Sequence, residues 1–190
     1  MATVQRHVPD HQYFAQFTGD NLHISATGGN HALYLTGTGN TVVATGGAEM
    51  VIATAGHNSI STGAGDDVIT LQGGGNVADA GGGNNTIYAG AGPGDKLVMP
   101  GAGHGFDSVY MTQGSDLSLD FRAALAGTDW DGSQATLGRY IHVATGASST
   151  AISISATAGG AETAIASLSN IGVPHAPQWD AATVFAHALT

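Results

Sequence analysis

The sequence T-G-A-G-D-D-V-I-T, residues 62–70, decides how the rest of this chain folds. Apart from its first position, it follows the nine-residue pattern G-G-x-G-x-D-x-U-x, in which U is a large apolar residue. Gly63 and Gly65 permit backbone turns that a side chain would forbid. Asp67 can offer a carboxylate to a cation held in the turn. The triplet 68–70 is a short strand whose middle side chain, Ile69, points inward.

Steps of nine residues from Ile69 meet apolar residues in both directions, without a gap, over residues 17–88. These residues are Ile24, Leu33, Val42, Val51, Ile60, Ala78 and Ile87. Neither the helical period nor the two-residue strand period produces a repeat of nine. A disordered glycine-rich segment would not hold aliphatic residues on a fixed lattice. The repeat therefore predicts an all-β fold, a parallel β-roll or β-helix.

The position two residues before each inward residue is polar in seven repeats of eight. Two nonapeptides make one coil, so residues 18 apart stack on strands about 4.8 Å apart. We call one stack the odd row; it contains Leu22, Asn40, Asn58 and Asn76. The other stack is the even row; it contains His31, Glu49, Asp67 and Asn85. Stacked asparagines favour a hydrogen-bond ladder along the coil axis.

Calcium binds about six to eight oxygens, several of them charged, so a row of neutral asparagines is a poor calcium site. We expect the odd row to be largely metal-free in its early coils. The even row offers better sites, between Glu49 and Asp67 and between Asp67 and Asn85. The alternative is that Asp67 and Glu49 are solvated turn residues. His31 lies 18 residues before Glu49, so an ion pair between them is expected rather than a transition-metal site.

Two further repeats follow with altered spacing, at residues 90–97 and 103–109. They restore aspartate at the candidate ligand position, and we expect Asp95 to face Asn76 and Asp107 to face Asn85. The full set of predicted calcium-site residues is Glu49, Gly63, Gly65, Asp67, Asn76, Gly83, Asn85, Asp95 and Asp107.

The outward strand positions differ between the two faces of the predicted roll. The even face is the more apolar, and its large outward residues are Tyr34, Met50, Ile52, Val68 and Tyr88. An apolar surface of this size seldom stays bare. We therefore expect that either the C-terminal segment or a second molecule, a protein or a glycan, packs over it.

The composition limits the classes of partner. Fourteen acidic residues against four basic ones give a net charge of −10, which excludes a basic nucleic-acid footprint and suits divalent cations. The chain has no cysteine, so a metal is the obvious substitute for disulfide bonds. Residues 1–10 have no apolar core of a signal peptide, and no run of 18 apolar residues predicts a membrane span.

After Gly105 the sequence becomes that of an ordinary globular segment, since 22 of the 30 glycines lie at or before that residue. Alternating or β-branched stretches predict strands at residues 116–121, 139–143, 151–155 and 164–168. Short helices are expected at 122–126 and 180–189, the latter alternatively a tail, with a break at 173–177. The predicted domains are a cap or linker at 1–16, the roll at 17–110 and a small antiparallel β capping domain at 111–190.

Residues 17–110 resemble the haemolysin-type calcium-binding β-roll of repeats-in-toxin (RTX) proteins. The tail resembles the C-terminal target domain of proteins exported by bacterial type I secretion. It shares the order of D-L-x-L-D-F, then L-x-R-Y-I-x-V at 137–143, then a T-A-I-S-I-S strand, then A-S-L-S-N-I-G at 166–172. The resemblance implies an extracellular protein exported through an ABC transporter without an N-terminal signal peptide, whose roll folds when it meets calcium.

The sequence predicts no catalytic site. His7 and His11 have a metal-site spacing but lie in a probable loop, and Asp129 and Asp131 are best explained as a turn anchored by a buried Trp130. Two alternatives to a calcium-responsive export module remain. One is an adhesin, surface-layer or polysaccharide-binding structural module. The other is an accessory module of an extracellular polysaccharide-modifying enzyme.

Overall fold

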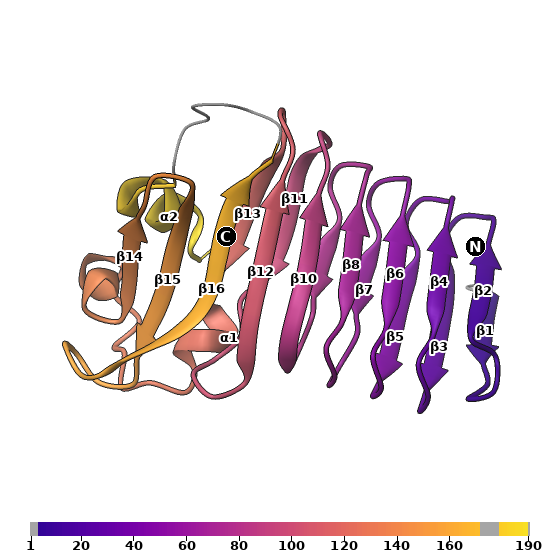
Figure 1. Ribbon diagram of the computed structural model, residues 1–190, viewed down its shortest axis with the longest axis horizontal. Coiled ribbons are helices and arrows are strands. Elements are labelled where there is room, and N and C mark those ends of the chain that lie inside the picture. Colours follow the sequence, from indigo (N-terminus) through magenta and orange to yellow (C-terminus); the bar gives the residue numbers. More distant parts are fainter. Residues whose placement is uncertain (1–3, 172–178, 190) are drawn as a thin grey trace.

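The computed structural model describes residues 4–171 and 179–189, and two facing sheets run the length of the molecule (Figure 1). The seven-stranded sheet has the order β1 (Val4–Val8), β3 (Leu22–Thr27), β5 (Thr41–Thr45), β7 (Ser59–Ser61), β9 (Val77–Asp79), β11 (Pro93–Val98) and β13 (Asp116–Asp120). The nine-stranded sheet has the order β14 (Ile141–Thr145), β15 (Ser149–Ser155), β16 (Glu162–Asn170), β12 (Gly105–Met111), β10 (Gly83–Ala89), β8 (Val68–Leu71), β6 (Met50–Ala53), β4 (Ala32–Leu35) and β2 (Phe14–Phe17). The chain alternates between the sheets, which makes a parallel β-solenoid.

The inward aliphatic residues form one column on each sheet. On the seven-stranded sheet the parallel register joins Ile24 to Val42, Val42 to Ile60, and Ile60 to Ala78. On the other sheet it joins Leu33, Val51, Ile69 and Ile87 in the same way. All eight side chains are at most 1% exposed. The nine-residue lattice and the all-β fold class are therefore confirmed.

The turns between strands bring the backbones of successive coils very close together. A Cβ atom on Gly65 would lie 1.8 Å from the carbonyl oxygen of Gly47, and one on Gly83 would lie 2.0 Å from that of Gly65. Both glycines also have left-handed φ angles, of 131° and 100°. Only glycine fits these positions, which explains why the repeats begin with it.

The solenoid begins before the predicted boundary at residue 17 and ends after the one at 110. Strand β1 pairs in parallel with β3 and β2 pairs with β4, so residues 4–17 form a coil rather than a linker. At the other end β13 pairs in parallel with β11. The first coil lacks the glycine pattern, which is why its sequence did not reveal it. It also places Arg6, an exposed residue, opposite Ile24 at the end of the aliphatic column.

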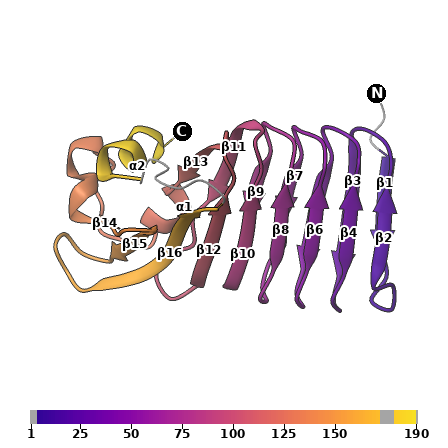
Figure 2. The same ribbon diagram turned by 45° about the horizontal axis from the view of Figure 1, so that its top comes forward.

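The C-terminal part continues the nine-stranded sheet instead of forming a separate one (Figure 2). Strand β16 pairs in parallel with β12, and β15 then pairs antiparallel with β16 and with β14. Helix α1 (Arg122–Leu125) and the 3-10 helix η1 (Gln134–Arg139) connect β13 to β14, and α2 (Ala181–His187) packs against β13 and β14. Within the described ranges, none of the helices has the length and hydropathy needed to cross a bilayer.

The strands and helices expected after residue 110 are present, with shifted bounds. Residues 116–120, 149–155 and 162–170 are strands, whereas the strand expected at 139–143 begins at Ile141 because η1 runs to Arg139. Asp180 caps α2 by accepting a hydrogen bond from the Thr183 amide at 2.8 Å. The break expected at 173–177 lies outside the described residues.

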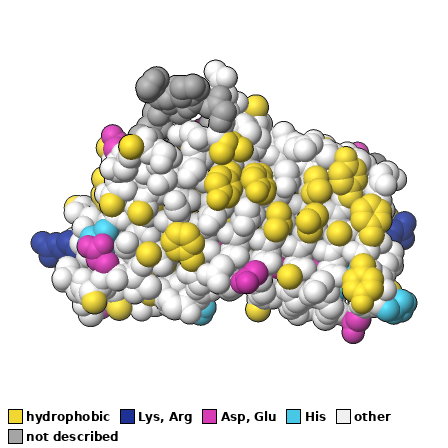
Figure 3. Space-filling model, in the orientation of Figure 1, with side chains coloured by type: hydrophobic (Ala, Val, Ile, Leu, Met, Phe, Trp, Pro, Cys, Tyr) yellow, Lys and Arg dark blue, Asp and Glu magenta, His cyan; other side chains and the backbone are white. Residues whose placement is uncertain are grey.

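The prediction that the C-terminal segment covers the apolar even face is wrong for the described residues. Strand β16 extends the sheet beside β12 and does not lie over β4, β6 and β8. Met50 and Tyr88 keep 45% and 40% of their surface exposed, while Tyr34, Ile52 and Val68 are half-buried. The space-filling view shows apolar side chains along this face (Figure 3). The alternative of a second molecule stays a prediction.

Candidate metal sites

The odd row is a ladder of buried amides. The Oδ1 atom of Asn40 accepts a hydrogen bond from the amide of Leu22, one coil earlier, at 2.8 Å. Asn58 accepts from the Asn40 amide in the same way at 2.9 Å, and Asn76 from the Asn58 amide at 2.9 Å. Asp95 closes the row by accepting from the Asn76 amide at 2.8 Å. The expected asparagine ladder is confirmed, as is the facing of Asp95 and Asn76.

The side-chain amide nitrogens of Asn58 and Asn76 are used as well. Asn58 donates through Nδ2 to the carbonyl of Ala55 at 2.8 Å, and Asn76 donates to the carbonyl of Gly73 at 2.7 Å. Each of these side chains thus ties its own turn, three residues back, to the neighbouring coil. A neutral amide therefore satisfies its buried surroundings here through both of its polar atoms.

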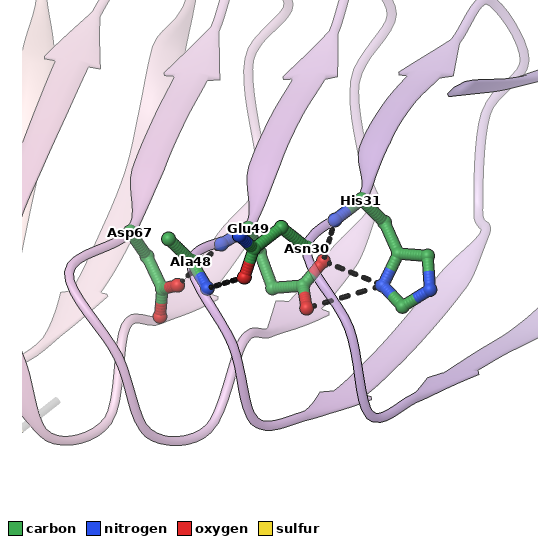
Figure 4. A network of polar contacts seen from close by, with 5 residues as sticks. All are labelled: Asn30, His31, Ala48, Glu49 and Asp67. Atoms are coloured by element: carbon green, nitrogen blue, oxygen red, sulfur yellow. Dashed lines mark hydrogen bonds and ion pairs between the residues drawn. The ribbon is translucent and has the colours of Figure 1, made fainter. Parts of the chain in front are cut away.

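The even row repeats the same geometry with charged side chains (Figure 4). Glu49 Oε2 accepts from the His31 amide at 3.1 Å, and Asp67 Oδ1 accepts from the Glu49 amide at 2.8 Å. Asn85 Oδ1 accepts from the Asp67 amide at 3.0 Å. Its Nδ2 donates to Asp107 Oδ1 at 2.9 Å, so the expected facing of Asn85 and Asp107 is confirmed.

His31 and Glu49 form the buried side-chain contact that their spacing predicted, which is an ion pair when the imidazole is protonated. His31 Nδ1 lies 3.0 Å from Oε2 and 3.2 Å from Oε1 of Glu49, and both side chains are completely buried. Both carboxylate oxygens of Glu49 therefore have a protein partner. This pairing makes Glu49 the least available of the predicted calcium ligands.

Each aspartate of the two rows has a carboxylate oxygen that finds no partner, whereas Asn58 and Asn76 use both of their polar atoms and Asn40 leaves only its Nδ2 unpartnered. In Asp67, Asp95 and Asp107 one carboxylate oxygen accepts a hydrogen bond while Oδ2 is buried without a partner. All three residues are at most 1% exposed. An ionised oxygen buried without a partner costs several kcal/mol unless a cation or a proton compensates it. These unpartnered oxygens favour the binding of a cation beside them.

Burial raises the pKa of these carboxyl groups. It raises the pKa of Glu49, Asp67 and Asp95 above the usual values, although hydrogen bonds from neighbouring groups oppose the shift. The effect is largest for Asp107, whose pKa rises to about 6 because of burial, with the negative charges of Asp79 and Asp67 adding to it. The metal-free row is therefore electrostatically unfavourable at neutral pH.

The oxygen atoms in and around the two rows are of the types that calcium binds. Carboxylate, amide and backbone carbonyl oxygens are the ligands that this hard cation takes. Among the described residues, no group of three or more His, Cys, Asp or Glu side chains converges on one point, so backbone carbonyls must complete any site. Gly63 and Gly65 lie in the turn before β8, and Gly83 is the first residue of β10; the carbonyl of Gly63 accepts from the Gly82 amide at 2.8 Å.

A second ladder, in the exposed turns, was not predicted. Asp20, Asn30 and Asp66 each accept through Oδ1 from a backbone amide one coil later, namely those of Thr38, Ala48 and Asn84, at 2.7–2.8 Å. These bonds run in the opposite direction to those of the buried rows. The same 18-residue spacing could have revealed this ladder, because Asn30 and Asp66 directly precede even-row positions and Asp20 lies two residues before an odd-row position.

One cluster in the C-terminal part has the residue types of a nucleophile site. His142 Nε2 lies 2.6 Å from Ser155 Oγ, and its Nδ1 lies 3.5 Å from Glu162 Oε1. The three residues sit side by side on β14, β15 and β16. Ser155, however, has no exposed surface, and a cleft of 340 Å³ nearby is lined by Ala156 but by none of the three. The contact therefore joins strands rather than presenting a nucleophile to solvent.

Two overlapping stretches of the chain, residues 43–78 and 72–92, match the RTX calcium-binding nonapeptide repeat, four copies. The stretches include β5 to β10 and three residues of the even row, Glu49, Asp67 and Asn85. This part of the parallel solenoid is therefore similar to an RTX β-roll. No curated protein and no solved structure matches the chain.

Proposed function

We propose that this protein is a calcium-binding β-roll module whose folding is coupled to extracellular calcium. The observation that carries the proposal is the buried Oδ2 atoms of Asp67 and Asp107, which have no partner within a row of a repeat known for binding calcium. When bound, calcium supplies the positive charge that these carboxylates need. Asp67, Asn85 and Asp107, with the backbone carbonyls of Gly63, Gly65 and Gly83, are the residues that would hold it.

The physical basis is linkage between binding and folding. A cation that binds only the folded roll stabilises it in proportion to the logarithm of the cation concentration. Where calcium is scarce, the buried carboxylates destabilise the roll. Where calcium is plentiful, as outside the cell, the same groups hold the coils together. Asp95, at the end of the odd row, offers a second site of the same kind.

The test is a calcium titration monitored by circular dichroism, with magnesium as the comparison cation. We expect the β signal or the melting temperature to rise with calcium. In Asp67→Ala, the calcium concentration at the midpoint should rise several-fold. Asp66→Asn is the matched control, because it removes a neighbouring exposed charge and keeps the acceptor for the Asn84 amide. Full β signal without metal, unchanged by calcium in the wild type, would show that the proposal is wrong.

We also propose that residues 111–190 carry a type I secretion signal and that the protein is secreted through an ABC exporter. The order of strands after Asp116, ending in β16 and α2, is what the resemblance to C-terminal target domains leads one to expect. The measurement is the amount of protein in the medium of cells that express a type I exporter. A chain lacking residues 179–190 should remain inside the cells, whereas a chain lacking residues 4–17 should still be exported.

A second candidate function is a structural or binding module of a cell surface, such as an adhesin or surface-layer piece. The outer face of the nine-stranded sheet favours it, because its strands present uncharged and partly apolar side chains to solvent. Binding to a panel of immobilised polysaccharides separates a glycan-binding module, or an accessory module of a polysaccharide-modifying enzyme, from one that binds protein.

A further inference from the structure

The outer face of the nine-stranded sheet is a flat array without charge over seven parallel strands. One outward row runs straight across the strands and contains Gln16, Tyr34, Ile52, Thr70, Tyr88, Tyr110 and Ser169. The second row contains Phe14, Ala32, Met50, Val68, Thr86, Ser108 and Ser167. None of these positions bears a charge, and apolar side chains follow the strands across the face (Figure 3). We call this surface the uncharged face.

Charged side chains lie elsewhere on the molecule. The chain carries 14 acidic and 4 basic residues, with a net charge of −10. Two copies therefore repel each other in most orientations, and charges brought together without partners oppose association. Among the described residues, the outward rows of the seven-stranded sheet include Asp79 and Lys96, whereas two copies that meet along the uncharged face bury no charge from its two rows.

The two tyrosines at the centre of the face argue against a sugar chain as the occupant. The rings of Tyr88 and Tyr110 are stacked, with centroids 5.4 Å apart and planes at 21°. Rings on adjacent strands that stack in this way stand up from the sheet, so each turns a face toward its neighbour and an edge toward solvent. A sugar ring needs an aromatic face that lies open. Upright side chains in rows are instead suited to interdigitate with those of a second sheet.

We propose that the uncharged face binds the same face of a second copy, which forms a two-fold symmetric dimer by sheet-on-sheet packing. Such an interface is isologous, so each contact occurs twice. An axis in the interface parallel to β8 would place β6 of one copy over β10 of the other, with Ile52 facing the partner's Tyr88 and Met50 facing the partner's Thr86. This inference does not depend on calcium binding.

The area of the uncharged face determines how strongly we expect two copies to bind each other. Seven strands at about 4.8 Å spacing and two rows of side chains give roughly 400 Å² per copy, or about 800 Å² in total. This is smaller than a standard stable interface, so the dimer should be weak and concentration-dependent. Screening by salt should strengthen it, because salt reduces the repulsion between two copies of charge −10.

The test is analytical ultracentrifugation of the full chain, in calcium-containing buffer, from micromolar to near-millimolar concentration. We expect a dimer whose fraction rises with protein and with sodium chloride. Met50→Asp should weaken dimerisation by at least about tenfold, since it buries an unpaired charge twice. Val77→Asp is the matched control, because Val77 is 37% exposed on the seven-stranded sheet, and this variant should dimerise as the wild type does.

A second measurement uses the absence of cysteine from the chain. Thr70→Cys on the central strand β8 should form an intermolecular disulfide under mild oxidation, and Ser59→Cys on β7 should not. A wild-type protein that stays monomeric at all concentrations and salt levels would overturn the proposal. Equal weakening by Met50→Asp and Val77→Asp would do so too. Binding of a neutral polysaccharide at this face by a monomer would identify a glycan as the occupant instead.

Discussion

The odd and even rows share one backbone geometry and differ in chemistry. In both, a side-chain oxygen accepts a hydrogen bond from the amide one coil earlier, at 2.8–3.1 Å. In the odd row Asn58 and Asn76 complete this pattern by donating to a carbonyl of their own turn, whereas Nδ2 of Asn40 is buried without a partner. Aspartate in the even row cannot donate when ionised, so one of its oxygens remains without a partner.

The difference shows that the β-roll does not need a metal at every turn to satisfy its backbone. The amides of Asn58 and Asn76 are satisfied within the chain, whereas the carboxylates of Asp67, Asp95 and Asp107 each keep one buried oxygen without a partner. His31 is a third solution, because it gives Glu49 a partner from within the chain. One molecule therefore combines coils whose buried polar side chains are satisfied within the chain with coils in which a carboxylate oxygen lacks a partner. We propose that calcium binds at the latter.

The largest expected effect comes from breaking the neutral row. Asn58→Ala removes the acceptor of the buried Asn40 amide and the donor to the part-buried Ala55 carbonyl, and leaves both groups without this partner. We expect a loss of about 3 kcal/mol in the free energy of unfolding. Chemical denaturation should give the same loss with and without calcium. Ser59→Ala, on the exposed neighbour, is the control; a calcium-dependent loss in Asn58→Ala would contradict the distinction between the rows.

The next largest effect comes from converting the even row into a copy of the odd one. In Asp67→Asn, Oδ1 can still accept from the Glu49 amide, and the new Nδ2 can donate to the carbonyl three residues back, as in Asn58. We expect the metal-free protein to gain about 2 kcal/mol at neutral pH and to respond less to calcium. Asp66→Asn should change neither property, and thermal melts in chelator check both.

The pH dependence of the metal-free protein follows from the same row. The pKa of Asp107 is about 6 in the folded state against an ordinary value of 3.8, so the folded state binds the proton more tightly. Its contribution to stability is therefore complete at low pH and is lost as the pH rises through about 6. Raised pKa values of Asp67 and Glu49 act in the same direction, and the lowered pKa of Asp120 acts against them.

We accordingly expect the metal-free roll to gain about 1–2 kcal/mol between pH 7 and pH 5. Saturating calcium should reduce this gain, because calcium competes with the proton for the same oxygens. Equilibrium unfolding at the two pH values, in chelator and in calcium, provides the measurement. In Asp107→Asn the gain in stability should be smaller. If the gain were as large as in the wild type, groups other than Asp107 would be responsible for it.

The smallest effect concerns the turns before the odd row. Asn21, Gly39, His57 and Gly75 occupy equivalent turn positions 18 residues apart, and all four have φ between 56° and 72°. A side chain in this conformation costs about 1–2 kcal/mol, part of which glycine returns through its freedom in the unfolded chain. His57→Gly should therefore stabilise the protein by about 0.5–1 kcal/mol in a thermal melt. His104→Gly, at an exposed residue outside these positions, should not be stabilising.

The period of nine was enough to predict the coils, both aliphatic columns and both polar rows, because each repeat must place one residue inward and one in the turn. It even predicted which partners Asp95 and Asp107 would have despite the insertions before them. The first coil escaped detection because Arg6 stands at the inward position and the turn around Asp10 lacks the glycines.

Two other features depend on long-range pairing that a local pattern does not encode. The pairing of β16 with β12 joins residues some sixty positions apart, so the sequence could show a strand near 164–168 but not where it lies. The orphaned oxygens likewise required the coordinates, because Asp67 and Asn58 occupy equivalent positions in the pattern. Which residues bind calcium stays a prediction.

The guanidinium of Arg6 has a consequence for higher-order assembly. A solenoid of identical coils exposes unpaired backbone and an open hydrocarbon seam at its end, and such an end is a template for fibre growth. A further apolar coil stacked on this end would have to remove water from the Arg6 guanidinium, which costs free energy. The charge at residue 6 therefore opposes the stacking of a further apolar coil on β1.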